Sequence, residues 1–261
     1  MFKKCVCKRV RRKKLHYKAV DSKASLVNLF WDQFLFLWQL IKSRFLFWLG
    51  LINFVILMLK LMLNSAIVPL FFIGVDFNAV KSGQVILPVF WFVYFVVPLL
   101  IVLSSFKQLW QVRGMQLRGL RYSPLSFAAV NVGLMGLITI IYVVLTDGIM
   151  TLMTDFSWLR NFKLLQFHGL PALLVLFIIN FLGIFLLLII QTTIGRFNAP
   201  LGIIIPFSLC IITIYTTWKY NPLNSLMLLR VNKNNILLLL VTTLLMTIVY
   251  LITNRYSELD Y

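Results

Sequence analysis

Residues 107–121 read KQLWQVRGMQLRGLR and form a short basic segment between two long apolar runs. Every charged residue in it is basic. Its basic residues and its tryptophan are Lys107, Trp110, Arg113, Arg118 and Arg121. Apolar runs of roughly 20 residues are long enough for an α-helix to cross the hydrocarbon core of a bilayer. The segment therefore predicts a loop in water between two membrane-spanning helices.

Composition places the whole chain in the membrane class. Of its 261 residues, 61% are hydrophobic, and the mean hydropathy is +0.93. Soluble domains are considerably more polar than this. The apolar runs are continuous and do not alternate with polar residues, which excludes a transmembrane β-barrel. We therefore expect an all-α integral membrane protein.

Six membrane-spanning helices are predicted within residues 45–253. Their expected ranges are 45–63, 85–106, 123–145, 170–193, 199–218 and 236–253. Most Lys and Arg residues then fall on the side of the two termini, so the positive-inside rule places both termini in the cytoplasm. Pro98, inside the second span, favours a kink and needs a neighbouring helix to satisfy the freed carbonyl.

Residues 219–235 do not agree with the positive-inside rule. This predicted outer segment carries Lys219, Arg230 and Lys233 with no acidic residue to balance them. We expect a short re-entrant or interfacial helix in it.

The formal net charge is +18, and its densest part is residues 1–24, where Asp21 is the one acidic residue. In a soluble protein such a charge would indicate nucleic-acid binding. In a membrane protein, Lys and Arg collect on cytoplasmic segments beside anionic lipid headgroups. We therefore expect residues 1–24 to form a cytoplasmic tail on membrane lipids, with no nucleic-acid partner. Residues 254–261 are expected to be a second cytoplasmic tail.

Residues 25–44 have apolar side chains at three- and four-residue spacing. Two tryptophans and two basic residues accompany this stripe: Trp31, Trp38, Lys42 and Arg44. The combination is typical of an amphipathic helix that lies in the membrane interface. A cytoplasmic extension of the first spanning helix is the alternative.

The sequence lacks the residues that most membrane enzymes and ion-coupled transporters need. No acidic residue lies in the middle of a predicted span, and Asp147 is placed in an outer loop at 146–169. Ion-coupled transport usually needs an ionisable group near the bilayer midplane. His16 and His168 fall on opposite sides of the membrane, so they cannot share a metal. We expect no enzymatic activity and no cofactor in this chain.

Nucleotide-binding motifs are also absent. The sequence has no GxxxxGK[ST] loop, so it cannot hydrolyse ATP in the P-loop manner. ATP-driven transport would need its motor on another polypeptide. The longest predicted inner loop between spans is 107–121, which makes it the best-placed docking segment for such a motor.

This layout resembles the membrane subunit of a type-2 ABC exporter, particularly the small permeases that accompany bacteriocin, lantibiotic or other peptide exporters in Gram-positive bacteria. An amphipathic helix before six spans carries the resemblance, together with QVRGMQLRGLRYSPLSF at 111–127. The outer segment YNPLNSLMLLR also matches, with Pro222, Met227 and Arg230 at the corresponding places. The chain departs from the pattern in its very basic N-terminal tail and in having no acidic residue before the coupling segment.

The resemblance implies a homodimer, or a paired permease, that binds two P-loop ATPase subunits. Residues 107–121 would be the coupling helix, and ATP and Mg²⁺ would bind only to the partner. Lys107, Trp110, Arg113, Arg118 and Arg121 would then contact the ATPase. Ordinary positive-inside topology explains the three arginines equally well.

Two functional hypotheses follow. The first is a permease subunit in a bacterial plasma membrane that exports an amphipathic peptide or another hydrophobic substrate with a separate ATPase. The alternative is a non-catalytic interaction or immunity protein that sequesters a toxin or scaffolds a complex without an ATPase. A membrane enzyme acting on lipid is disfavoured, because the expected acid, base and metal-binding residues are missing.

Overall fold

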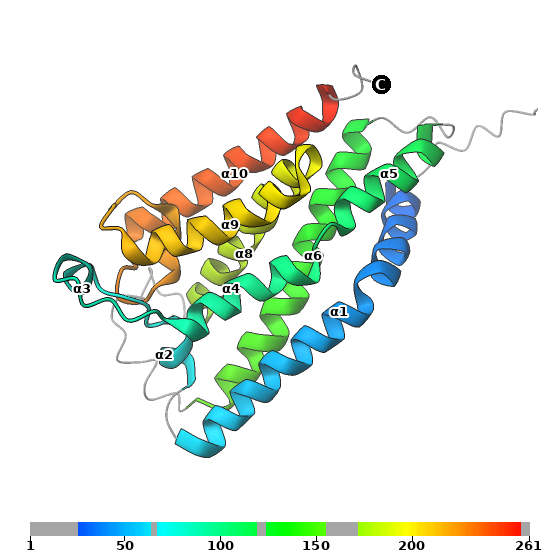
Figure 1. Ribbon diagram of the computed structural model, residues 1–261. Coiled ribbons are helices and arrows are strands. Elements are labelled where there is room, and N and C mark those ends of the chain that lie inside the picture. The colour runs from blue at the N-terminus through cyan, green and yellow to red at the C-terminus, as the bar shows by residue number, and fades with distance from the viewer. Residues whose placement is uncertain (1–25, 64–66, 119–123, 155–171, 257–261) are drawn as a thin grey trace, which may run out of the picture.

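The computed structural model describes residues 26–63, 67–118, 124–154 and 172–256, and these residues form an all-helical bundle without strands (Figure 1). Within them, five helical segments are long and apolar enough to cross a membrane. These are α1 (Leu26–Leu63), the segment Val89–Val112, α6 (Pro124–Leu152), α8 (Ala172–Phe197) and α10 (Lys233–Tyr256). The chain is therefore a multi-pass membrane protein.

Shorter helices complete the bundle. The predicted fifth span is α9 (Ala199–Tyr215), whose 17 residues extend about 25 Å, less than a bilayer core. The remaining short elements are α2 (Ile67–Phe72), α3 (Phe77–Lys81) and the 3-10 helix η2 (Pro222–Leu226). The start of α1, the end of α10 and the turn between α8 and α9 lie at one end of the bundle (Figure 1), which we call the α8–α9 end. The opposite end, which carries η2, is the η2 end.

The two elements predicted at 25–44 and 45–63 form one helix. α1 continues through residue 45 for 38 residues, about 57 Å of helix, which is the continuity that the alternative prediction required. Leu37 and Ile41, each 1% exposed, belong to the apolar stripe that predicts an interfacial helix. This part of α1 packs along α5 and α6 (Figure 1). An apolar stripe fits a helix partner as well as it fits lipid, and α1 has no proline to end it.

The predicted second span is interrupted. α4 (Val89–Ile101) ends one turn after Pro98, and α5 (Ser105–Arg118) follows. Proline leaves the carbonyl four residues earlier without its helical partner. That carbonyl belongs to Tyr94, and the hydroxyl of Tyr142 on α6 donates to it at 3.0 Å. The neighbouring helix thus satisfies the carbonyl as predicted.

Helices α8 and α9 cross closely beside their connecting turn. A Cβ atom on Gly202 would lie 2.5 Å from the Cα of Gly195, well inside van der Waals contact. Glycine at these positions therefore allows the two backbones to touch, the arrangement that small residues permit between membrane helices.

A carboxylate joins three helices near the η2 end. The predicted outer loop at 146–169 starts too early, because α6 continues to Leu152 and includes Asp147, which is 1% exposed. The hydroxyl of Tyr94 on α4 donates to Asp147 at 2.6 Å, and the side-chain amide of Asn180 on α8 donates at 2.8 Å. The predicted span stops at residue 145, two residues before this carboxylate, but a charge with two donors can lie inside a helix bundle.

The segment after α9 folds back into the bundle at the η2 end. η2 and the residues after it are mostly buried. The amide of Leu228 donates to the carbonyl of Phe72 at 2.8 Å, and the indole of Trp91 donates to the carbonyl of Leu226 at 2.9 Å. These bonds tie η2 and the residues after it to α4 and α2.

Arg230, 3% exposed, holds this segment in place. Its guanidinium donates to the backbone oxygens of Val75, Thr213 and Ile214 and to the side chain of Asn224. Two of these acceptors belong to the last turn of α9, where a cation also complements the helix dipole. Burial lowers the pKa of Arg230, and the nearby carboxylate of Asp76 opposes that shift. The charge that looked unbalanced in the sequence is thus stabilised by carbonyl groups.

Candidate functional site

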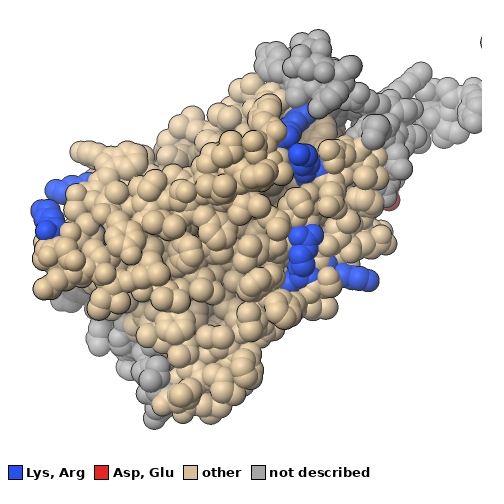
Figure 2. Space-filling view, in the orientation of Figure 1, with Lys and Arg blue, Asp and Glu red and all other residues tan. Residues whose placement is uncertain are grey.

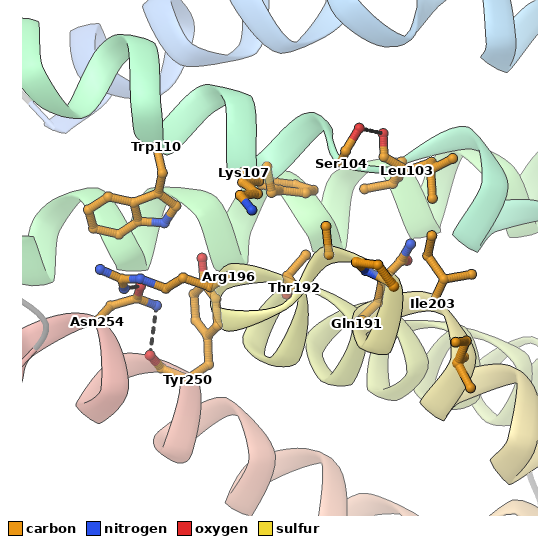
Figure 3. A pocket seen from close by; sticks show the side chains of 17 residues that line it. Leu103, Ser104, Lys107, Trp110, Gln191, Thr192, Arg196, Ile203, Tyr250 and Asn254 are labelled. Atoms are coloured by element: carbon orange, nitrogen blue, oxygen red, sulfur yellow. Dashed lines mark hydrogen bonds between the residues drawn. The ribbon is translucent and has the colours of Figure 1, made fainter.

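A cavity of about 550 Å³ lies at the α8–α9 end of the bundle. Its walls come from the junction of α4 with α5, the last turns of α8 and α10, and the start of α9 (Figure 3). Most of its lining is apolar. The polar and charged residues that line it are Ser104, Lys107, Gln191, Thr192, Arg196, Tyr250 and Asn254.

The junction between α4 and α5 forms one edge of the cavity. Ser104 has a φ of 56°, a left-handed conformation that is strained for a residue other than glycine. Arg44 on α1 braces this junction from outside by donating to the carbonyl of Leu103 at 2.8 Å and to the hydroxyl of Ser105 at 2.9 Å. The interruption between α4 and α5 is therefore stabilised by hydrogen bonds from a neighbouring helix, α1.

Two basic side chains face the cavity from opposite walls. Lys107 extends from α5, and Arg196 lies at the end of α8 (Figure 3). The guanidinium of Arg196 lies 4.5 Å from the ring centroid of Trp110 and donates a hydrogen bond to the side chain of Asn254 on α10. A cation–π contact and a hydrogen bond from different helices fix the plane of this guanidinium.

The cavity has a positive electrostatic character. None of the described residues in its lining is acidic. Two cations beside an apolar lining favour an anionic ligand, because opposite charges attract most strongly where water is excluded.

Gln191 supplies a further polar group to the lining. Its side chain is 5% exposed and donates from Nε2 to the carbonyl of Leu99 at 2.9 Å. Its Oε1 is buried and accepts no hydrogen bond from the described residues. A buried acceptor without a donor is costly, so this atom marks a place where a ligand could donate.

The predicted coupling residues have different positions. Lys107 and Trp110 line the cavity on α5. Arg113 and Arg118 also belong to α5, but the structure does not describe their side chains, and Arg121 falls outside the described residues. The expected helix at 107–121 is thus present as far as residue 118.

The predicted lipid-interface residues also differ in their exposure and position. Trp31 is exposed, and so is Lys42, two residues before Arg44. Trp38 is half-buried beside Phe34, with ring centroids 6.3 Å apart, and Arg44 braces the junction. Exposed apolar, aromatic and basic side chains on α1 remain suited to lipid contact.

Sequence reasoning missed Gln191, Arg196, Tyr250 and Asn254 as members of one site. These residues come from two helices, α8 and α10, and the spacing of residues in the sequence does not predict how the two helices are aligned. Arg196, a charged residue at the end of an apolar run, was the available signal, since charged residues in or beside spans often mark functional sites.

Basic side chains on the viewed face lie at the η2 end and in separate groups on the other half of the molecule, with uncharged surface between the two halves (Figure 2). Among the described residues, no group of three His, Cys, Asp or Glu side chains could hold a metal ion.

Comparison with protein-family models, with curated proteins and with solved structures found no match to this chain.

Proposed function

We propose that this chain is the membrane subunit of a transporter for amphipathic molecules, driven by a separate P-loop ATPase that docks on α5. One observation carries the proposal: α5, the basic helix between apolar runs, is also a wall of the cavity. A force applied to the outer surface of α5 would therefore reach the cavity directly.

The junction at residues 102–104 supports a hinge in this mechanism. α5 is joined to α4 through a non-helical linkage with Ser104 in a left-handed conformation, and hinges are commonly a few such terminal residues. Rotation of α5 would move Lys107 and Trp110 relative to Arg196 on α8. The cavity would then change shape while the hydrogen-bonded η2 end stays fixed.

The orientation in the membrane is part of the proposal. α5, the end of α8 and the end of α10 would face the cytoplasm, where a soluble ATPase is available. The basic residues near that end agree with the positive-inside rule. We further propose that two copies pair in the membrane, each with one ATPase.

Purification of the full chain from its native membrane in mild detergent tests the proposal. We expect a protein with a P-loop motif to accompany it in a fixed ratio, with ATPase activity in the complex. Reversal of Arg113, Arg118 and Arg121 to Glu should abolish association while membrane insertion is unchanged. Lys81→Glu and Lys219→Glu, exposed residues of the η2 end, are the matched controls.

Two results would contradict this function. A chain that carries out its cellular role without any ATPase would support the interaction or immunity protein instead. Unchanged activity after the three arginine reversals would do the same, because it would show that α5 receives no partner.

A further inference from the structure

We propose that the cavity is a binding site for a single-chain anionic glycerophospholipid, whose phosphate lies between Lys107 and Arg196. The inference deepens the proposed function and rests on it only for the idea that the bound molecule is moved. Binding itself requires no ATPase.

The phosphate position follows from the two cations. Lys107 and Arg196 face the same space from α5 and α8 (Figure 3). Arginine presents a planar set of donors that matches phosphate, and lysine adds a compact charge. The contact of Arg196 with Trp110 holds the guanidinium in one orientation before a ligand arrives, which lowers the entropic cost of binding.

Gln191 favours a ligand that carries a hydrogen-bond donor. It precedes Arg196 by five residues on α8, so its backbone lies about 7.5 Å deeper toward the η2 end. Its buried Oε1 lacks a donor among the described residues. In a lysophospholipid, the free glycerol hydroxyl lies between the phosphate and the acyl chain. That order of groups matches the order of Arg196, Gln191 and the apolar lining.

The acyl chain has an apolar wall to follow. Val102, Phe106, Ile203 and Ile204 line the cavity together with the polar residues. The volume of about 550 Å³ falls within the roughly 300–1,000 Å³ of ordinary small-molecule sites. One chain with a phosphate headgroup suits this size and this mixture of surfaces.

Native mass spectrometry of the purified full chain in an uncharged detergent tests the assignment. We expect lysophosphatidylglycerol to bind in a ratio of one per chain. Lysophosphatidylcholine with the same acyl chain should bind at least about tenfold more weakly, because its choline meets the two cations. Glycerol phosphate, which has the headgroup chemistry without the chain, should neither bind nor displace the lipid.

Variants locate the site. Lys107→Gln should weaken lysophosphatidylglycerol binding about tenfold, the effect of one charge-assisted hydrogen bond, whereas Lys107→Arg should keep it. Lys42→Gln removes an exposed charge of α1 that does not line the cavity and should have no effect. Ile203→Trp should lower binding by filling the apolar part of the cavity, and an unchanged melting temperature would show that it folds.

Three results would overturn the site: equal binding of the two lysolipids, wild-type binding by Lys107→Gln, or displacement of the lipid by glycerol phosphate. The last result would mean that the cavity holds a free phosphate group. Lipid binding without any associated ATPase would leave the site standing and remove the transport function. An associated ATPase without lipid binding would remove the lipid site and leave the transport function standing.

Discussion

Arg230 donates a hydrogen bond to the backbone oxygen of Val75, 155 residues away in sequence. The same guanidinium reaches the last turn of α9. One buried side chain therefore joins the connection that follows α2 to the end of α9 at the η2 end.

Loss of this arginine should destabilise the fold strongly. Arg230→Ala would leave several buried carbonyl groups without donors, at about 1–3 kcal/mol for each unsatisfied group. We expect a decrease of at least about 3 kcal/mol in the free energy of unfolding, measured by denaturant titration in mixed micelles. Arg230→Lys keeps the charge but not the planar set of donors and should give an intermediate decrease. Lys219→Ala, on an exposed side chain, should change little, and a loss equal to that of Arg230→Ala would contradict this view.

Asp147 should act as a junction between helices. Asp147→Ala would leave the Tyr94 hydroxyl and the Asn180 amide buried without their acceptor, and the free energy of unfolding should fall by about 2–4 kcal/mol. Tyr94→Phe removes one hydrogen bond and should cost only about 1 kcal/mol. Asp32→Ala, on the exposed face of α1, is the control. If Asp147→Ala retains full stability but loses activity, the carboxylate has a functional role and the structural assignment fails.

The crossing of α8 and α9 should not tolerate a methyl group. Gly202→Ala would place a Cβ against the backbone of Gly195, so the two helices must separate, and overpacking of this kind costs about 1–3 kcal/mol. Gly148→Ala, where a Cβ meets nothing within 4 Å, should be neutral or stabilising by up to about 1 kcal/mol. Melting temperatures of the two variants give the comparison. Equal values would show that α8 and α9 do not pack as closely as described.

Removal of Arg44 should loosen the α4–α5 junction. In Arg44→Gln, the carbonyl of Leu103 and the hydroxyl of Ser105 lose their charged donor. Local opening then becomes easier, and we expect faster amide hydrogen exchange across residues 103–110. Lys42→Gln, two residues away but exposed, should leave this exchange unchanged. Identical exchange in both variants would mean that α1 does not brace the junction.

The helical class could be predicted because it depends on local properties. In lipid, the backbone N–H and C=O groups of a long apolar run have no water to bond, so they must form hydrogen bonds within a helix. The satisfied carbonyl opposite Pro98 follows from the same local rules. The helix at 107–118 was expected from the family resemblance and not from these rules, because the segment is basic and not apolar. The segment 219–235, set apart by Arg230 and its neighbours, does hold a short helix, η2.

The cavity could not be predicted, because it depends on how helices are aligned. Arg196 and Asn254 meet across 58 residues of sequence, and nothing in either apolar run fixes that alignment. Asp147 falls in the predicted outer loop for a related reason: the sequence does not show the donors on α4 and α8 that allow it inside the bundle. The apolar stripe of α1 was ambiguous, since lipid and helix partners select the same pattern.

The packing of α1 has a consequence for biosynthesis. The buried stripe of α1 lies against α6, which ends at Leu152. When α1 leaves the ribosome, the helix that will cover this stripe has not been made. The nascent helix must therefore wait in lipid or against the insertion machinery until more than half of the chain is synthesised. Its long apolar surface, which stays largely exposed even in the finished bundle, suits it to that delay.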